Sequence, residues 1–239
     1  MLGLGSNLTK VNRLVLSPVT DSLVLKHDYQ LRPVRPLSDG AAYFVASNTD
    51  SISLGVGTAL TPEITGFTAC FWAKTNDAST NAMVLACDNG THQRMYIGLK
   101  DGSYDFGIGN TAWSGASTSA TTDWTHVALT YTTGDVAQLY INGVKDYVDN
   151  DNDANAFTDG TFGGNFYLGQ HGSSTSYPWD GYICNVGLWN TTLTQTEIKS
   201  IMWKDYSQLT SDEITNLTAW WNLSVDASDS LGDYPGTLS

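Results

Sequence analysis

Short runs of alternating apolar and polar residues fill most of the chain after residue 40. In residues 67–74, Phe67, Ala69, Phe71 and Ala73 take every second position, which is the period of a β-strand with one buried face. Comparable strand-like runs lie at 95–99, 104–108, 123–131, 138–141, 165–169, 181–189 and 220–223. The pattern therefore predicts many short strands.

Turn signals separate these runs. Asp101-Gly102 stands between two of the predicted strands, and Asn142-Gly143 follows a third. Both dipeptides favour tight hairpins, because Asn, Asp and Gly tolerate positive φ. Short strands with frequent turns predict an all-β fold, a two-sheet antiparallel jelly-roll sandwich over residues 41–223.

Helix signals are confined to the last quarter of the chain. Thr194 and Glu197 have the spacing of a capping box, in which a Thr and a Glu three residues later satisfy each other's backbone N–H groups. Thr210 and Glu213 repeat that spacing. We therefore expect short C-terminal helices, mainly within residues 194–217.

The first 40 residues differ from the rest. Residues 1–35 hold five basic and two acidic residues, a net charge of +3, and Pro18, Pro33 and Pro36 disfavour helices and central strands. The segment predicts an extended N-terminal anchoring arm (1–40) in front of a body (41–239). Packing on its own body as an edge strand is an equal alternative. The residues expected to bind a partner are Leu14, Leu16, Leu23, Leu25, Arg32 and Arg35.

The overall composition narrows the class of protein. The chain has 239 residues, 41% hydrophobic and 11% aromatic, enough for a substantial core. Its net charge of −13 argues against nucleic-acid binding, which uses basic patches. No apolar run is long enough to span a membrane. The opening residues 1–10 lack the cationic start and apolar core of a signal peptide, so we expect synthesis in the cytoplasm.

The cysteines carry no evident chemistry. Cys70, Cys87 and Cys184 are an odd number without metal-type spacing, and each lies in an apolar, strand-like run. They are predicted to be buried free thiols.

Residues for catalysis are also scarce. Glycoside hydrolysis needs two carboxylates around the scissile bond. The chain has three Glu, of which Glu197 and Glu213 belong to the capping boxes and Glu63 stands alone after a proline. The four histidines share no motif, and His126 is expected to be a packed sheet residue. We therefore expect a protein without enzymatic activity.

Several strand sequences resemble one known family. Their order is that of laminin-G-like domains in the concanavalin A-like jelly-roll superfamily, and the resemblance covers residues 41–205. The matching segments are GFTACFWAK at 66–74, DWTHVALTY at 123–131, LYING at 139–143, FYLG at 166–169 and WDGYICNVGLWN at 179–190. The resemblance implies a concanavalin A-like jelly roll.

The family resemblance leaves the function open, because the fold hosts lectins, glycosidases, adhesion modules and viral surface proteins. An extended arm before one such body is similar to structural proteins of tailed bacteriophages. This predicts a virion protein, a capsid decoration or tail appendage subunit, bound to other capsid or tail proteins and to copies of itself. The alternative is a carbohydrate-binding or adhesion module that recognises surface glycans.

The resemblance also implies a possible metal site, since laminin-G-like domains often bind Ca²⁺ at the sandwich rim. Asp88, Asn89 and Asp180 stand at turn positions that resemble this rim. Their alternative role is that of ordinary turn formers.

Aromatic residues in loops are the candidates for sugar stacking. Trp113, Tyr177 and Trp179 lie in Ser- and Gly-rich surroundings, where a ring can stack on a pyranose. They can equally cover the end of the sandwich. The remaining strand tryptophans are predicted to be core residues: Trp72, Trp124, Trp189, Trp220 and Trp221.

Overall fold

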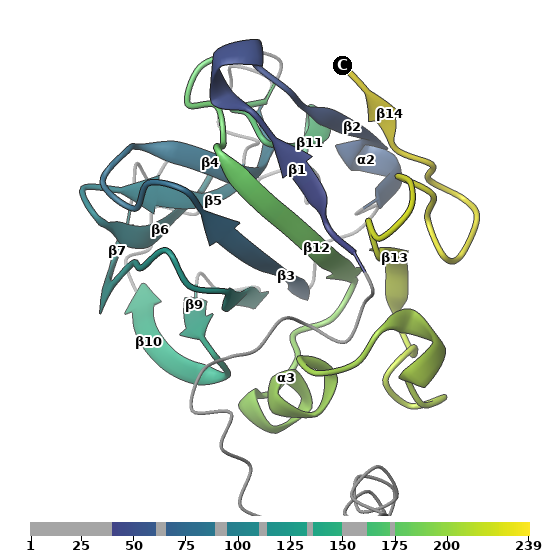
Figure 1. Cartoon of the computed structure of the whole chain (residues 1–239). Coiled ribbons are helices and arrows are strands. Elements are labelled where there is room, and N and C mark those ends of the chain that lie inside the picture. The colour runs from purple at the N-terminus through teal and green to yellow at the C-terminus, as the bar shows by residue number, and fades with distance from the viewer. Residues whose placement is uncertain are drawn as a thin grey trace, which may run out of the picture. The chain divides into compact units, whose positions relative to one another are not determined.

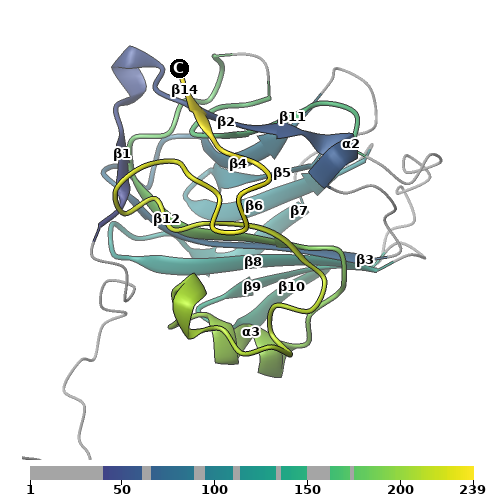
Figure 2. The same cartoon turned by 90° about the vertical axis from the view of Figure 1, so that its right-hand side faces the viewer.

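Two antiparallel sheets face each other and enclose the core (Figures 1 and 2). The computed structural model describes residues 40–60, 66–88, 95–109, 114–132, 136–149, 162–172 and 175–239. Within these residues each sheet has seven strands. The predicted two-sheet antiparallel sandwich is confirmed.

The first sheet, sheet A, has the order β1-β12-β3-β8-β9-β10, and β13 also pairs with β12. The second, sheet B, has the order β14-β2-β11-β4-β5-β6-β7. The strands of sheet A are β1 (Ala42–Phe44), β3 (Gly66–Thr75), β8 (Thr125–Thr132), β9 (Val136–Ile141), β10 (Val144–Asp149), β12 (Gly181–Trp189) and β13 (Leu217–Trp221). Those of sheet B are β2 (Ile52–Val56), β4 (Ala82–Cys87), β5 (Met95–Lys100), β6 (Ser103–Ile108), β7 (Ser114–Ser119), β11 (Asn165–Leu168) and β14 (Thr237–Leu238).

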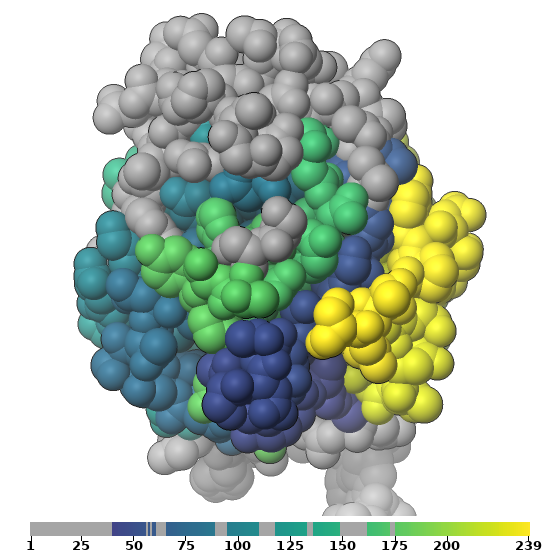
Figure 3. All heavy atoms as spheres, turned by 90° about the horizontal axis from the view of Figure 1, so that it is seen from above, coloured from purple at the N-terminus to yellow at the C-terminus, as the bar shows by residue number. Residues whose placement is uncertain are grey.

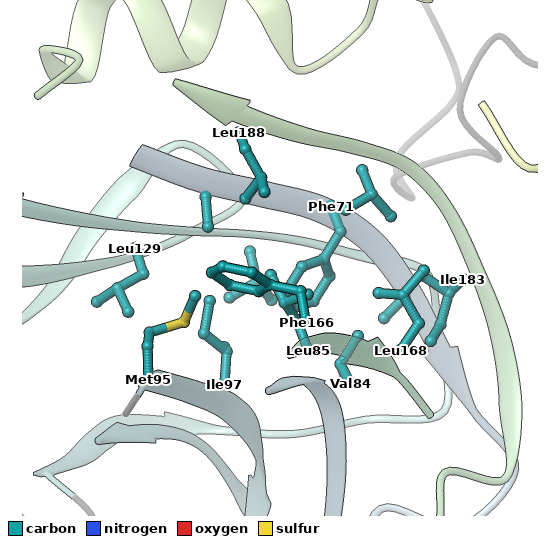
Figure 4. Packing of buried hydrophobic residues seen from close by; sticks show 14 of the residues in the cluster. Phe71, Val84, Leu85, Met95, Ile97, Leu129, Phe166, Leu168, Ile183 and Leu188 are labelled. Atoms are coloured by element: carbon teal, nitrogen blue, oxygen red, sulfur yellow. The ribbon is translucent and has the colours of Figure 1, made fainter. Parts of the chain in front are cut away.

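The core lies between the inner faces of the two sheets. Phe71 and Ile183 of sheet A lie opposite Phe166 of sheet B, and none of the three is exposed (Figure 4). Burial of each such side chain contributes about 1.5–3 kcal/mol. The alternation predicted for residues 67–74 is confirmed, since its four apolar side chains all join this core.

One helix covers part of the outer face of sheet A. The capping box of α3 (Gln195–Ile201) forms as predicted: the Thr194 backbone N–H donates to Glu197 Oε2 at 2.7 Å, and the Glu197 N–H donates to Thr194 Oγ1 at 3.3 Å. Ile198 and Ile201 pack on sheet A, so both faces of β3 are covered over part of its length.

The other helical segments differ from the prediction. The hydrogen bonds between Thr210 and Glu213 form, but residues 211–216 make turns, because no apolar stripe continues the pattern into a helix. A 3₁₀ helix spans Tyr206–Gln208. The sequence pattern does not predict the 3₁₀ helix Ala46–Asn48 or the short α2 (Gly57–Leu60).

Both predicted hairpin turns are confirmed. Asp101 and Gly102 have φ angles of 51° and 84°, and Asn142 and Gly143 have φ angles of 51° and 72°. These left-handed pairs match the twist of the strands that they join.

The predicted buried thiols are also confirmed. All three cysteines are free and buried, and burial raises the pKa of Cys70 and Cys87 to about 12. His126 is a buried sheet residue as expected, and burial lowers its pKa to about 3.

Residues 1–39 lie outside the described residues, and so do the expected partner-binding leucines and arginines. The anchoring arm and its edge-strand alternative both stay predictions. Among the described residues, no helix has the length and apolar character needed to cross a membrane.

Candidate functional site

The outer face of sheet B combines small and polar residues. On β5 and β6, alternate side chains enter the core, which leaves Tyr96 and Gly98 of β5 and Asp105 and Gly107 of β6 on the outer face. Tyr96 pairs with Ala86 on one side and with Gly107 on the other. Because these neighbours are small, the tyrosine ring can lie flat over their backbone.

Gly107 is required by the position of the Tyr96 ring. A Cβ atom at Gly107 would lie 2.2 Å from Tyr96 Cζ, far inside van der Waals contact. The ring therefore packs directly over the β6 backbone, and Tyr96 is buried.

The 169–180 segment, which links β11 to β12 and is described except for residues 173–174, runs beside β4. Backbone hydrogen bonds attach it there: Gly169 donates to Val84 at 3.0 Å, and Met83 donates to Tyr177 at 2.9 Å. In Figure 3, which views the molecule from the side of sheet B, the green residues of this segment lie beside the blue residues of neighbouring strands. The segment thereby brings its own side chains to the outer face.

His171 connects this segment to β4. Its Nε2 atom lies 3.1 Å from Oδ2 of Asp88, the residue after the end of β4. The imidazole is 6.0 Å from the Tyr96 ring and 6.1 Å from the Tyr177 ring, measured between centroids. A carboxylate, an imidazole and two phenol rings therefore converge, and we call Asp88, Tyr96, His171 and Tyr177 the sheet B site.

The members of the sheet B site differ in accessibility. Asp88 is 8% exposed and His171 is 24% exposed, whereas Tyr177 is 43% exposed. Tyr177 has a φ of 55°, a left-handed conformation uncommon for a bulky residue. Such strained backbone is often found at ligand-binding positions.

Asp105 adds a second buried carboxylate to this face. Burial raises its pKa to about 6, although the Phe106 N–H donates to Oδ1 at 2.6 Å and partly offsets this effect. It lies far from Asp88, because Asp105 pairs with Gly98 and Gly98 pairs with Met83, at the opposite end of β4. Five residues along a strand are about 16 Å.

The predicted stacking residues have different positions. Tyr177 is exposed and belongs to the sheet B site. The exposure expected of Trp179 is wrong, because its side chain is fully buried in the core. Its backbone N–H donates to the carbonyl of Gly169 at 2.8 Å, which holds the 169–180 segment against the end of β11. Trp179 therefore covers the end of the sandwich, the alternative that the sequence left open. Trp113 lies outside the described residues.

The predicted metal ligands do not form one cluster in the described part of the chain. Asp88 pairs with His171, whereas the Asp180 carbonyl accepts a 2.9 Å hydrogen bond from Asn76 beyond the end of β3. No group of three His, Cys, Asp or Glu side chains among the described residues is arranged to hold a metal. Asn89 lies outside those residues, and the Ca²⁺ site stays a prediction.

Sequence reasoning missed Tyr96, His171 and Asp105. The pairing register of β5 and β6 places Tyr96 and Asp105 on the outer face. The 169–180 segment, which returns to β4, places His171 there. The only local signal is the placement of Tyr96 and Asp105 at outward positions of strands that were predicted correctly. No comparable signal marks His171.

The two buried carboxylates on the outer face of sheet B, Asp88 and Asp105, are too far apart for glycoside hydrolysis. Inverting and retaining glycosidases place two carboxylates within about 10 Å of each other. Asp88 follows the end of β4, whereas Asp105 of β6 is level with the start of β4. Glu197 and Glu213 are held in capping boxes.

Comparison with known proteins gives a family and a set of similar folds. Residues 46–199 match the Laminin_G_3 family model, described as the concanavalin A-like lectin/glucanases superfamily. No curated protein sequence matches the chain.

Solved structures resemble the chain at low sequence identity. A "putative carbohydrate binding protein" from Bacteroides ovatus ATCC 8483 has a TM-score of 0.63 and 18% identity, and the match covers 86% of this chain. The match covers 59% of that protein, so this chain spans about three fifths of its length.

Two further structures were determined with sugars. Domain 4 of AbnA, a GH43 extracellular arabinanase from Geobacillus stearothermophilus, in complex with arabinotriose, has a TM-score of 0.53 and 20% identity, covering 68% of this chain and 76% of that one. The CBM40 of the Ruminococcus gnavus IT-sialidase, bound to α2,3-sialyllactose, has a TM-score of 0.50 and 16% identity, covering 69% and 99%. At these identities the likeness shows a common fold.

Proposed function

Because the chain belongs to the Laminin_G_3 family of the concanavalin A-like lectin and glucanase superfamily, we propose that it is a non-catalytic glycan-binding domain whose ligand contacts the sheet B site. The observation that carries the proposal is the exposed Tyr177 ring beside the Asp88–His171 pair. A ring can stack on the apolar face of a pyranose. The carboxylate accepts hydrogen bonds from sugar hydroxyls, and the imidazole can donate or accept.

The comparisons support this class of ligand. Each of the three similar structures is described as carbohydrate binding or was determined with an oligosaccharide. The separation of Asp88 from Asp105 supports binding without hydrolysis at this face.

The test begins with a glycan array probed with the full chain, followed by titration calorimetry with the retained glycans. Tyr177→Asn removes the ring and keeps a residue that tolerates the left-handed backbone. Asp88→Asn and His171→Gln each alter one member of the Asp88–His171 pair. We expect each variant to weaken binding roughly tenfold or more, the range of a lost hydrogen bond to a charged group.

Val225→Asn is the control, since Val225 is 93% exposed and does not belong to the sheet B site. This variant should bind like the wild type, and no glycan should be cleaved during incubation. The proposal is wrong if the array retains nothing, or if all three site variants bind with unchanged affinity.

The predicted role as a virion protein is independent of the glycan-binding proposal. No observation on the described residues favours a capsid or tail position, and the expected anchoring residues lie in the segment before Gly40. A virion location, self-association and the arm's role therefore stay predictions. A glycan-binding body is compatible with each of them.

A further inference from the structure

Four side chains form a row across the outer face of sheet A, opposite to the sheet B site. Tyr43 of β1 pairs with Tyr182 of β12, and Tyr182 pairs with Lys74 of β3. Trp124 directly precedes Thr125, which pairs with Ala73, so Trp124 stands beside Lys74. We call Tyr43, Tyr182, Lys74 and Trp124 the aromatic row.

The alternation of the strands turns the aromatic row outward. Phe44, Ile183 and Ala73 are buried in the core. Each of them stands next to a member of the row in its own strand, so that member points to the other face. The row crosses three strand spacings, about 14 Å. This is longer than one pyranose, which is about the size of a phenyl ring.

The rings of the row are close enough to act as one platform. The centroids of Tyr43 and Tyr182 are 4.7 Å apart, and those of Tyr182 and Trp124 are 6.1 Å apart. Asn76 Nδ2 donates to the Tyr43 hydroxyl at 3.3 Å, which orients the outermost ring. Tyr43 is 51% exposed, and the other rings of the row are partly exposed.

A cleft of about 430 Å³ opens at the row. It is lined by Gly40, Ala41, Lys74, Trp124 and Tyr182. Trp124, predicted to be a core residue, packs against the core but is only partly buried, because it precedes β8 at the end of the sheet and lines this cleft. Farther along the same face, α3 and the residues after it cover the sheet, as the hydrogen bond from Trp72 to Met202 shows.

Lys74 gives the cleft a charge preference. Its ammonium lies 6.0 Å from the centroid of the Tyr182 ring, and it makes no ion pair among the described residues. A cation held beside aromatic rings without a carboxylate partner can bind an anionic group of a ligand. The net charge of −13 opposes polyanions, which favours a ligand with a single acidic group.

We propose that the aromatic row is a second glycan-binding site, selective for an oligosaccharide in which one sugar carries a carboxylate. Tyr43 and Trp124 stack on sugar rings, Lys74 pairs with the carboxylate, and the Tyr182 ring forms the floor between them. This site does not depend on the sheet B site, because the two lie on opposite faces of the sandwich.

The experiment uses the full chain and pairs of ligands that differ in charge. An array of acidic glycans identifies the ligand. The first titration calorimetry compares α2,3-sialyllactose, which carries a carboxylate, with its methyl ester and with lactose, which do not. Lys74→Met should weaken binding of the acidic glycan roughly tenfold to hundredfold, the value of a charge-assisted hydrogen bond. It should leave binding of the ester unchanged, and Lys74→Arg should retain most of the affinity for the acid.

Lys145→Met is a matched control. Lys145 also stands 6.0 Å from an aromatic centroid, that of Tyr140, but outside the cleft. This variant should bind like the wild type. Tyr43→Ala and Trp124→Ala should each weaken binding of the acid and the ester alike, since both ligands stack on the rings.

Variants of one site should leave binding at the other site unchanged, which distinguishes the two proposals. Tyr177→Asn should not alter binding of the acidic glycan to the aromatic row, and Lys74→Met should not alter binding at the sheet B site. Both Lys74→Met and Tyr43→Ala should keep the wild-type melting temperature and should weaken binding of an acidic glycan. The second site is disproved if the array retains no acidic glycan. It is also disproved if these folded variants bind the retained acidic glycan like the wild type.

Discussion

The indole Nε1 of Trp72 donates a 2.6 Å hydrogen bond to the carbonyl of Met202, the C-cap residue of α3. Trp72 is 1% exposed, so no water can replace this partner. The contact joins the middle of sheet A to a helix 130 residues later in the chain.

The first prediction concerns this contact. Trp72→Phe removes the donor, leaves the Met202 carbonyl with one partner fewer and opens a small cavity. The free energy of unfolding should fall by about 2–3 kcal/mol, as judged from urea denaturation. Trp203→Phe is the control, because Trp203 packs on Trp72 but is 41% exposed. An equal loss in both variants would contradict the role given to the hydrogen bond.

The second prediction concerns acid stability. Burial raises the pKa of Glu213, but hydrogen bonds from Lys204, Ser200 and Thr210 outweigh this effect and lower the pKa to about 2. The stability that Glu213 contributes is therefore complete above pH 4.5, its unfolded value, and is lost as the pH falls towards 2.

Lys204→Met should lower the free energy of unfolding by about 1 kcal/mol at pH 7, after allowance for solvent screening. The loss should shrink towards zero near pH 2. Lys199→Met, which alters an exposed lysine of α3 five residues before Lys204, should have little effect at either pH. A pH-independent loss in Lys204→Met would mean that packing, and not charge, is responsible.

The third prediction concerns Asp105, whose pKa is raised from 3.8 to about 6 by burial. The folded protein therefore holds this proton more tightly than the unfolded chain. The free energy of unfolding should fall as the pH rises from about 4 to about 6, by on the order of 1 kcal/mol. The difference between the wild type and Asp105→Asn, measured across this range, isolates the effect. A flat difference would contradict the raised pKa.

The fourth prediction concerns the thiols. With pKa values near 12 and buried side chains, Cys70 and Cys87 should not react with a thiol reagent at pH 8 while the protein is folded. In denaturant all three cysteines should react. Rapid reaction of a thiol in the folded state would show that its strand opens readily.

The sequence predicted those features whose cause is local. The strand at 181–189 was located to the residue, because its apolar pattern and the preceding turn both lie within a few residues. The two hairpins depend only on residues that tolerate positive φ. The first capping box likewise needs two residues three apart.

The sites depend on contacts between distant segments. His171 meets Asp88 because the 169–180 segment returns along β4, and Trp124 meets Tyr182 because of strand order. Neither fact leaves a periodic signal in the sequence. For the same reason, a Ser- and Gly-rich neighbourhood could not distinguish the exposed Tyr177 from the buried Trp179.

The last prediction concerns the packing beneath the sheet B site. In Gly107→Ala the new Cβ would lie 2.2 Å from Tyr96 Cζ, so the ring must move away from β6. The added methyl should lower the free energy of unfolding by about 1–3 kcal/mol, the cost of overpacking. In a Tyr96→Ala background the same substitution should cost nothing, and it should even stabilise slightly, because alanine loses less backbone entropy than glycine in a strand. Thermal or urea denaturation of the four proteins completes this double-mutant cycle. If Gly107→Ala is equally costly in both backgrounds, the glycine is required by something other than the Tyr96 ring, and the floor of the sheet B site is not built as described.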